Sequence, residues 1–407
     1  MGRAPRLLWV NHFAVAPDMG GGTRHIELGR ELATLGWDVR IAASDFHLHR
    51  RTYLRRRNAE DRQVVAERLD GVEVDWLWAS PYTSNDLRRV GNWLTFARSL
   101  AAHHFEQPPD LVIGSTPHLF AALAALRVAR RLGVPFVLEV RDLWPESLAV
   151  GGAARGVGYA ALAAIANRLY RRADHIIVLA RGVADYLVER GVPRSRLSVV
   201  PNGADVAMYA AAGRVNGHPG MRLVYAGAHG PANGLDAVLD AAKELRDDGG
   251  IDFLLVGDGP SRQALRARAQ HEGLSNVHFE EPVAKSAMPD LLARCDVGLM
   301  VLKDVPLFAF GVSPNKIFDY WSAGLPVVCN VAGEVAEWVR ESGGGVQAAD
   351  GSGAALAEAV RQLRALPPDE RRRLGERGRE WVRREHDRPV LARRLDELLR
   401  PLARVEA

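Results

Sequence analysis

Short apolar segments alternate with longer amphipathic ones along this 407-residue chain, and this alternation constrains the fold more than any other feature. In the first half, stretches such as 24–35, 119–132 and 157–172 repeat apolar residues every three or four positions, as helices do. Between the helical stretches lie segments with the length and content of buried strands: 7–10, 38–42, 72–77, 111–113, 135–140, 175–178 and 197–200. Because alternating strands and helices form parallel sheets with right-handed crossovers, the first half predicts a doubly wound α/β sheet.

The alternation stops at Pro201-Asn202-Gly203-Ala204-Asp205 and in the small, polar stretch 211–220, and then begins again. The second half has expected strands at 222–226, 253–256, 277–279, 297–301 and 326–329. Its expected helices are 235–245, 261–272, 288–293 and 314–322. We therefore predict two Rossmann-like domains, 1–203 and 204–382, of about 200 residues each. The charged, amphipathic segment 383–407 is expected to return to the first domain as a helix.

Composition excludes several classes of protein. Hydrophobic residues make up 47% and charged residues 25%, as in a soluble globular enzyme, and no run of 18 or more apolar residues occurs. Because no signal-peptide pattern precedes the first expected strand, we expect a cytoplasmic protein. Cys295 and Cys329 lie in apolar strand-like contexts and are expected to be buried, reduced thiols. We expect no metal cofactor, because there is no Asp-x-Asp triplet and no convincing His pair on a helix.

The net charge is only +4, but basic residues gather in one region, 47–57, and Arg88-Arg89 follow. Aromatic and apolar residues are interleaved with them or lie nearby: Tyr53, Leu54, Trp76, Trp78 and Trp93. This combination is typical of peripheral contact with an anionic membrane. A solvated, arginine-rich loop explains it equally well. Nucleic acid is not an expected partner, because no nucleic-acid-binding motif accompanies the charge.

The segment 313–328 predicts a helix whose N-terminus binds an anion. Ser313 is a favourable N-cap and Pro314 suits the first helical position, which leaves the next backbone amides free for a diphosphate. Asn315, Lys316 and Asp319 fall in one sector of this helix, and an apolar face turns the other way. The alternative is an ordinary surface helix with a Lys316–Asp319 pair.

Three glycine-containing loops follow expected strands, where ligands bind in α/β sheets. Gly20-Gly21-Gly22 follows the first strand, Gly227, Gly230 and Gly234 follow the strand 222–226, and Gly257-Asp258-Gly259-Pro260 follows the next. Each loop alone is also compatible with a flexible turn. Together with the helix start at 313–314 they predict one ligand site, in a cleft where the carboxyl ends of the two sheets meet.

The order of these motifs, together with Glu139-Val140-Arg141-Asp142-Leu143-Trp144-Pro145-Glu146 and Val200-Pro201-Asn202-Gly203, resembles the family 4 retaining glycosyltransferases. Within that family the chain is most similar to bacterial enzymes of cell-surface polysaccharide synthesis. The resemblance covers nearly the whole chain. It implies the GT-B fold, with an acceptor-binding first domain and a second domain that binds a nucleotide-sugar donor.

The resemblance also implies roles for residues of the second domain. Asp319 takes the second acidic position of the family's E-x7-E motif and is expected to bind the ribose hydroxyls. The first acidic position falls on Gly311, so backbone amides from Phe310 through Val312 to Ser313 would replace a carboxylate. The family's diphosphate-binding Arg and Lys appear here as Ala228 and Asn233. A base pocket is expected at Glu280-Glu281-Pro282-Val283.

Positive charge for a departing diphosphate must therefore come from other groups. Lys316 and the helix N-terminus are the expected substitutes, with Arg141, Arg262 and His229 in reserve. Gly21, Gly22, Gly227 and Gly257 complete the expected donor-binding set, and Arg141, Asp142 and Lys316 form the expected catalytic set. Many relatives have His where this chain has Arg141, which indicates a different sugar pocket. His118 and Glu146 are expected on the acceptor side, although Glu146 is equally typical of a helix-capping acid.

We therefore expect a metal-independent, retaining transfer of a hexose or N-acetylhexosamine from a UDP-linked sugar to a lipid-linked or surface glycan. In that mechanism the acceptor hydroxyl attacks from the face that the diphosphate leaves, and a phosphate oxygen takes its proton. The sequence contains no nucleophile dyad or Gly-x-Ser-x-Gly motif that would indicate another chemistry. Two alternatives stay open: a GT-B-like sugar-nucleotide epimerase or phosphorylase, and a non-catalytic nucleotide-sugar-binding scaffold.

Overall fold

The computed structural model describes residues 3–18, 22–48, 50–84, 86–150, 156–210, 220–305, 308 and 311–405. The chain divides into two compact units. The first comprises residues 1–16, 22–201 and 391–407, and the second comprises 17–21 and 202–390.

The first unit is built on an eight-stranded sheet with the order β3-β4-β2-β1-β5-β6-β7-β8. Its strands are β1 (Arg6–Val10), β2 (Asp38–Ser44), β3 (Val65–Leu69), β4 (Val72–Leu77), β5 (Leu111–Ser115), β6 (Phe136–Val140), β7 (His175–Val178) and β8 (Leu197–Val199). Its helices are α1 (Arg24–Thr34), α2 (Leu87–Ala102), α3 (Leu119–Leu132), α4 (Glu146–Val150), α5 (Val157–Arg172) and α6 (Arg181–Glu189), with a short 3-10 turn η1 (Arg194–Arg196). All neighbouring strands are parallel except β3 and β4.

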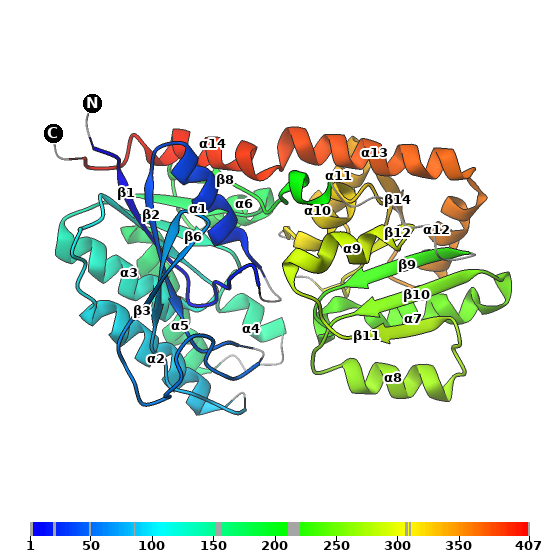
Figure 1. Ribbon diagram of the computed structural model, residues 1–407, viewed down its shortest axis with the longest axis horizontal. Helices are drawn as coiled ribbons and strands as arrows, with labels where there is room; N and C mark the ends of the chain where they lie inside the picture. Colours follow the sequence, from blue (N-terminus) through cyan, green and yellow to red (C-terminus); the bar gives the residue numbers. More distant parts are fainter. Residues whose placement is uncertain are drawn as a thin grey trace. The chain divides into compact units, whose positions relative to one another are not determined.

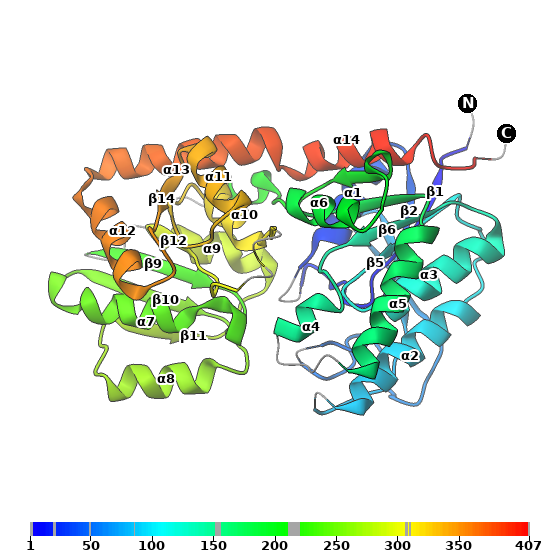
Figure 2. The same cartoon turned by 180° about the vertical axis from the view of Figure 1, so that it is seen from behind.

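Burial on both faces explains why the central strands read as continuous apolar runs. Leu7, Leu8, Trp9 and Val10 of β1 are all at most 1% exposed. Such strands are typical of parallel sheets that helices cover on each side. Figures 1 and 2 show α1 on one face of this sheet and α2, α3 and α5 on the other.

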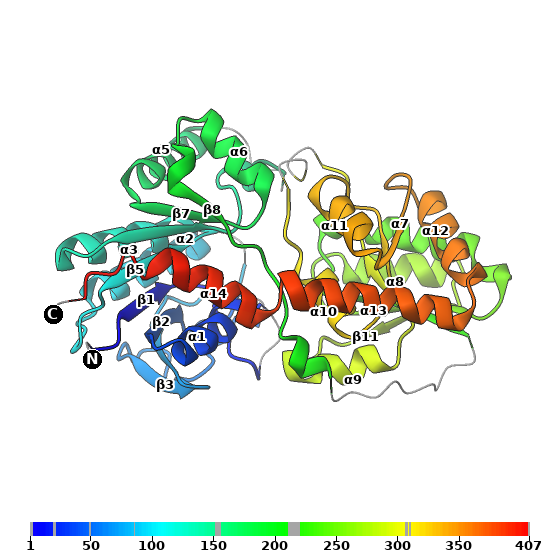
Figure 3. The same cartoon turned by 90° about the horizontal axis from the view of Figure 1, so that it is seen from above.

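The end of the chain packs on the first unit. Helix α14 (Arg388–Leu399) buries Leu391 and Leu395 completely. The indole Nε1 of Trp37 donates a hydrogen bond to Asp396 Oδ1 at 2.7 Å. Figure 3 shows α14 beside α1. The predicted return of the C-terminal helix to the first domain is therefore confirmed.

The second unit contains a six-stranded parallel sheet with the order β11-β10-β9-β12-β13-β14. Its strands are β9 (Met221–Ala226), β10 (Ile251–Val256), β11 (Val277–Glu280), β12 (Val297–Met300), β13 (Val327–Cys329) and β14 (Gly345–Gln347). Its α-helices are α7 (Leu235–Glu244), α8 (Arg262–His271), α9 (Met288–Ala293), α10 (Asn315–Ser322), α11 (Glu334–Ser342), α12 (Gly353–Ala365) and α13 (Pro368–Glu385). Its short 3-10 turns include η2 (Val206–Tyr209), η3 (Pro231–Asn233), η4 (Arg246–Asp248) and η5 (Lys285–Ala287).

Two apolar cores lie on opposite faces of this second sheet. One joins it to α7, α8 and α12, and the other joins it to α9, α10, α11 and α13. Cys295 and Cys329 are buried and unoxidised in the second core, as predicted, and burial raises the pKa of each thiol to about 12. Among the described residues, no helix combines the length and apolar character needed to cross a membrane.

Two strands were not predicted from the sequence. The antiparallel edge strand β3 alternates half-buried and exposed residues and contains Glu67 and Arg68, so it lacks an apolar run. The other edge strand, β14, is only three residues long and contains a glycine. Edge strands need less apolar surface, because they have a neighbour on one side only.

Candidate functional site

Helix α10 begins one residue later than predicted. Pro314 is extended (φ −73°, ψ 127°) and occupies the N-cap position, and Asn315 is the first helical residue. The prediction of Ser313 as N-cap was wrong, because its Oγ accepts a hydrogen bond at 2.8 Å from the backbone N–H of Asn202 instead. No side chain caps α10. The amides of its first turn therefore have no partner within the helix and present an anion-binding end.

The ammonium of Lys316 lies against the loop that follows β9. Its Nζ is 3.2 Å from the hydroxyl of Tyr225 and 3.3 Å from Oδ1 of Asn233, and it lies over the Tyr225 ring at 4.7 Å. Burial lowers the pKa of Lys316 to about 8. The ammonium of a lysine on α10 therefore lies beside Asn233, the position where the family pattern has a Lys.

Asp319 faces a different group of residues. Its carboxylate forms an ion pair with Lys285 at 2.5 Å, and the Lys285 ammonium lies 3.3 Å from the hydroxyl of Tyr209. Asp319 and Lys316 therefore do not form the surface pair considered as an alternative. Asn315 points its Oδ1 into a buried position without a hydrogen-bond partner in the described part of the chain.

Lys285 was missed by the sequence analysis. It follows the expected base-pocket turn, 280–283, by two residues, but nothing in its neighbourhood indicates that it meets a carboxylate 34 residues away. Val283 of that turn and Val312 are both partly buried against the core that contains α10.

The loops after β9 and β10 are in direct contact. The amide of Gly227 donates to Val256 O at 2.9 Å, and a Cβ on Gly257 (φ +145°) would lie 1.9 Å from Gly227 O. A Cβ on Gly227 would meet the side chain of Lys316 at 3.1 Å. Glycine at both positions allows this close approach. The structure therefore brings Gly227, Gly257, Asn233 and Lys316 together.

His229 belongs to the loop after β9, and its backbone N–H donates a hydrogen bond to Asp258 O in the loop after β10 at 2.8 Å. It is fully buried, neither ring nitrogen has a partner among the described residues, and burial lowers its pKa. The lowered pKa disfavours the charged imidazole, so His229 is less suited than Lys316 to supply positive charge. Arg262, the other reserve in this unit, forms an ion pair with Glu281 at 2.6 Å.

Gly311 adopts a positive φ of 93°. Residues with a side chain rarely adopt this conformation, so a carboxylate at this first acidic position of the family pattern would strain the backbone. Of the other residues expected to bind a donor, Phe310 and Gly21 lie outside the described residues. Gly22 is described and lies two residues before α1.

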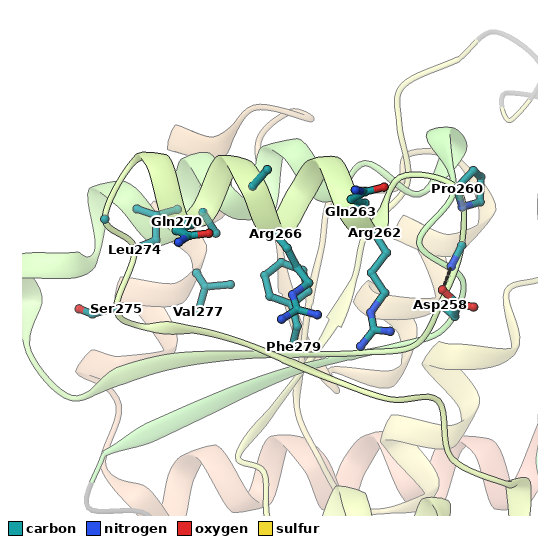
Figure 4. A pocket seen from close by; sticks show the side chains of 14 residues that line it. Asp258, Pro260, Arg262, Gln263, Arg266, Gln270, Leu274, Ser275, Val277 and Phe279 are labelled. Atoms are coloured by element: carbon teal, nitrogen blue, oxygen red, sulfur yellow. Dashed lines mark hydrogen bonds between the residues drawn. The ribbon is translucent and has the colours of Figure 1, made fainter.

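A groove of about 1010 Å³ follows α8 and the edge strand β11 (Figure 4). Only its Asp258-Gly259-Pro260 end belongs to the glycine loops, and α10 does not line it. Its charged residues are Asp258, Arg262 and Arg266. We therefore place the candidate site at the start of α10.

In the first unit, Arg141 and Asp142 follow β6. The amide of Arg141 donates to Thr116 Oγ1 at 2.9 Å, and its buried side-chain Nε has no partner among the described residues. Asp142 is exposed as a residue, but the surrounding protein atoms still desolvate its carboxyl group and raise its pKa. Both residues lie directly after β6, at the carboxyl end of a central strand.

The two residues expected on the acceptor side have structural partners. His118 caps α3 through Nδ1, stacks on Trp93 at 5.5 Å, and is buried, and burial lowers its pKa. Glu146 accepts a hydrogen bond from the Tyr186 hydroxyl at 2.6 Å and pairs with Arg190. Glu146 also begins α4, as its helix-capping interpretation predicts.

A buried ionic network lies near Arg141 and was also missed. Glu139 of β6 pairs with Arg24 at 3.0 Å, and both side chains are fully buried. Burial raises the pKa of Glu139, but the charge of Arg24 and a hydrogen bond from His25 outweigh burial and lower it overall. Arg24 also donates to the carbonyls of Val200 and Pro201, which precede the second unit.

The basic region 47–57 is partly internal. Arg56 is buried and pairs with Asp45, and Arg55 pairs with Glu67. Trp76 and Trp93 belong to the core, so they are not available to a membrane as expected. Arg50, Arg51, Arg57 and Arg88 are exposed cations, and Leu87, which precedes Arg88 in the chain, is 85% exposed. No group of three or more potential metal ligands occurs in the described ranges.

Solved structures define the class of fold. Sucrose-phosphate synthase from Thermosynechococcus elongatus matches 98% of this chain and 99% of its own, with a TM-score of 0.76 and 18% identity. Anabaena Alr3699/HepE, solved in complex with UDP and glucose, matches 97% of this chain and 99% of its own, with a TM-score of 0.67 and 16% identity. The chain has the GT-B fold, as predicted.

Sequence comparison identifies the family. A "Glycosyl transferase 4-like domain" matches residues 20–203, and "Glycosyl transferases group 1" matches residues 220–365. Together the two matches cover most of the chain, and the chain belongs to the glycosyltransferases.

Two relatives illustrate this membership. A protein of Escherichia coli named "Putative colanic acid biosynthesis glycosyl transferase WcaI" is 28% identical over 230 residues, which are 53% of this chain. The match spans 56% of the length of WcaI. The 2-deoxystreptamine glucosyltransferase of Streptomyces kanamyceticus is 27% identical over 291 residues, 68% of this chain and 73% of the relative.

Proposed function

We propose that this protein transfers a hexose or N-acetylhexosamine from a UDP-linked sugar to a lipid-linked or cell-surface glycan, with retention of configuration. The observation that carries the proposal is the uncapped start of α10 with the Lys316 ammonium beside the glycine loops. Free amides and a cation are what a leaving diphosphate requires. The UDP and glucose bound to HepE and the polysaccharide role of WcaI support the choice of substrates.

Lys316 and the first-turn amides of α10 would bind the diphosphate, and Asp319 would accept hydrogen bonds from the ribose hydroxyls. Because these groups supply the positive potential, we propose that catalysis needs no resident metal. A phosphate oxygen would take the proton of the attacking acceptor hydroxyl. Arg141 and Asp142 of the first unit would contact the acceptor.

We further propose that the protein works at the inner face of the cell membrane. Arg50, Arg51, Arg57 and Arg88 are exposed, and Leu87, the residue before Arg88, exposes an apolar side chain. The segments that carry them are joined by hydrogen bonds from Arg51 to Thr83 O and from the Tyr82 hydroxyl to Leu48 O. Exposed cations next to an apolar residue fit an anionic lipid surface, where a lipid-linked acceptor would be found.

The first experiment measures the thermal stability of the purified protein with UDP, GDP, ADP or TDP, with and without magnesium. A ligand that binds only the folded state raises the melting temperature. We expect a shift with UDP that does not require magnesium. A relative described as GDP-mannose-dependent makes GDP the most informative competitor. No shift with any nucleotide would contradict the proposal.

Asp319→Asn tests the ribose contact, because it removes the charge and keeps the shape. We expect the wild type to bind UDP about tenfold more tightly than 2′,3′-dideoxy-UDP, since a hydrogen bond to a charged group contributes about 1.5 kcal/mol or more. The variant should lose this preference. If both proteins prefer UDP over the dideoxy analogue equally, Asp319 does not contact the ribose.

Transfer itself is tested with UDP-sugars and an extracted lipid-linked acceptor. Sugar transfer to the acceptor supports the proposal. Epimerisation of the donor without acceptor would identify an epimerase, and nucleotide binding without turnover would identify a scaffold protein.

A further inference from the structure

Asn202, where the long segment of the second unit begins, is hydrogen-bonded to the turn that leads into α10. Asn202 is buried, with 4% of its surface exposed. Its backbone N–H donates to Ser313 Oγ at 2.8 Å, and its side-chain Nδ2 donates to Ser313 O at 2.5 Å. Ser313, which accepts both hydrogen bonds, is the residue immediately before the N-cap of α10, Pro314. Asn202 therefore holds the turn from which the free amides of α10 project.

The segment 386–388, near the C-terminal end of the second unit, also contacts α10. His386 follows α13, and its ring stacks on Phe318 of α10 with centroids 4.7 Å apart. Its Nδ1 lies 3.2 Å from Asn202 O. Ala204 pairs with this segment through hydrogen bonds from Ala204 N to His386 O and from Arg388 N to Ala204 O. Residues 202–204 and 386–388 thus form one support beneath α10.

Two hydrogen bonds to a single residue fix its orientation as well as its position. Ser313 is followed by proline, so its backbone is restricted to extended conformations and the turn has few other ways to rearrange. The direction of the amides of Asn315, Lys316 and Ile317 depends on this turn. Charge-dipole binding at a helix start falls off within the first turn, so a small rotation of α10 changes the interaction with an anion.

We propose that Asn202 is a positioning residue for the diphosphate of the donor, acting through Ser313 on the first-turn amides of α10. This inference rests on the proposed function, because it requires that the start of α10 binds the diphosphate. Asn202 does not contact the ligand in this proposal. Its loss should weaken recognition of the phosphates and leave recognition of the base and ribose unchanged.

The test measures the dissociation constants of UDP and uridine by calorimetry and uses their ratio as the readout. Asn202→Asp removes the Nδ2 donor at constant size, and Ser313→Ala removes the acceptor of the backbone bond. We expect the advantage of UDP over uridine to fall about three- to tenfold in each, as for the loss of one buried hydrogen bond. Ser313→Thr keeps the Oγ and should retain most of the wild-type ratio.

Asn276→Asp is a matched control. Asn276 is also buried in the second unit and lies between α8 and β11 in the chain. Its Nδ2 donates to Ala242 O of α7 at 2.9 Å, away from α10. This variant should lower the melting temperature without changing the UDP-to-uridine ratio. Both Asn variants lose a buried amide donor, so the control separates a general loss of stability from loss of positioning.

The outcomes distinguish the inference from the function on which it rests. If the wild type binds no nucleoside diphosphate, the proposed function fails and the inference fails with it. If the wild type binds UDP and both Asn202→Asp and Ser313→Ala keep the wild-type ratio, the function stands and the positioning role is wrong. If Asn202→Asp does not fold, Ser313→Ala alone decides.

Discussion

At the scale of single residues, the chain supplies positive charge from an unusual position. Where the family pattern has Arg and Lys in the loop after β9, this chain has Ala228 and Asn233, and the Lys316 ammonium lies 3.3 Å from Asn233. At Gly311, where the family pattern has a carboxylate, φ is +93°, a backbone conformation that favours glycine over residues with a side chain. These departures are therefore accommodated locally.

The lowered pKa of Lys316 predicts a pH dependence. Burial brings this pKa from 10.5 to about 8, so the side chain of the free protein loses its proton as pH rises through about 8. A diphosphate binds the protonated form more tightly, so the affinity for UDP should fall by up to about tenfold per pH unit above that point. Calorimetric titration between pH 7 and 10 measures this slope.

Lys316→Met should bind UDP about ten- to a hundredfold more weakly at pH 7 and lose the slope above pH 8. Lys243→Met, on the exposed side of α7, is the control and should keep both. Because the folded pKa is below the unfolded one, the unfolded state holds more protons between about pH 8 and 10.5. The wild type should therefore gain stability over this range and Lys316→Met should not.

At the scale of elements, the sequence identified the strands and helices that have strong apolar periodicity. Central strands such as β1 and helices such as α3 were found because burial on both faces, or on one stripe, leaves a pattern in neighbouring residues. The edge strands β3 and β14 were not found, since they need little burial. The start of α10 was displaced by one residue because Ser313 bonds to Asn202, 111 residues away, which no local rule can detect.

The close contact between the loops after β9 and β10 predicts that adding a methyl group at Gly257 lowers stability and nucleotide affinity. In Gly257→Ala the Cβ would lie 1.9 Å from Gly227 O, so one loop must move. We expect unfolding to require about 1–3 kcal/mol less free energy and UDP affinity to fall about tenfold. Gly351→Ala, whose Cβ would meet only ordinary contacts at 3.8 Å, is the control and should behave like the wild type in denaturant unfolding and UDP titration.

At the scale of the whole molecule, the fold was predictable and much of the candidate site was not. Two domains and the returning C-terminal helix follow from patterns repeated over many residues. The partners of site residues do not: Lys285 of Asp319, Asn202 of Ser313 and Arg24 of Glu139 each join distant parts of the chain. Such pairs leave no periodic signal, because a single contact depends on where two elements are placed by the whole fold.

The proposed membrane binding is tested on the whole molecule. We expect the protein to sediment with phosphatidylglycerol vesicles and not with phosphatidylcholine vesicles. Arg50→Glu, Arg57→Glu and Arg88→Glu combined should weaken binding more than tenfold, since each cation near an anionic surface contributes about 1 kcal/mol. Arg127→Glu, Arg130→Glu and Arg171→Glu combined make the same charge change at other exposed positions of the first unit. Equal loss in both triple variants would show that net charge alone is responsible.

The return of α14 has a consequence for the order in which the protein folds during synthesis. Trp37 meets Asp396 across 359 residues of chain, and residues 391–407 belong to the first unit. The surface around Leu35 and Trp37, just after α1, therefore stays uncovered by the C-terminal segment until the ribosome has made the whole second unit. A nascent chain that has emerged only as far as residue 390 carries an incomplete first unit, and its exposed apolar surface is a natural binding site for chaperones.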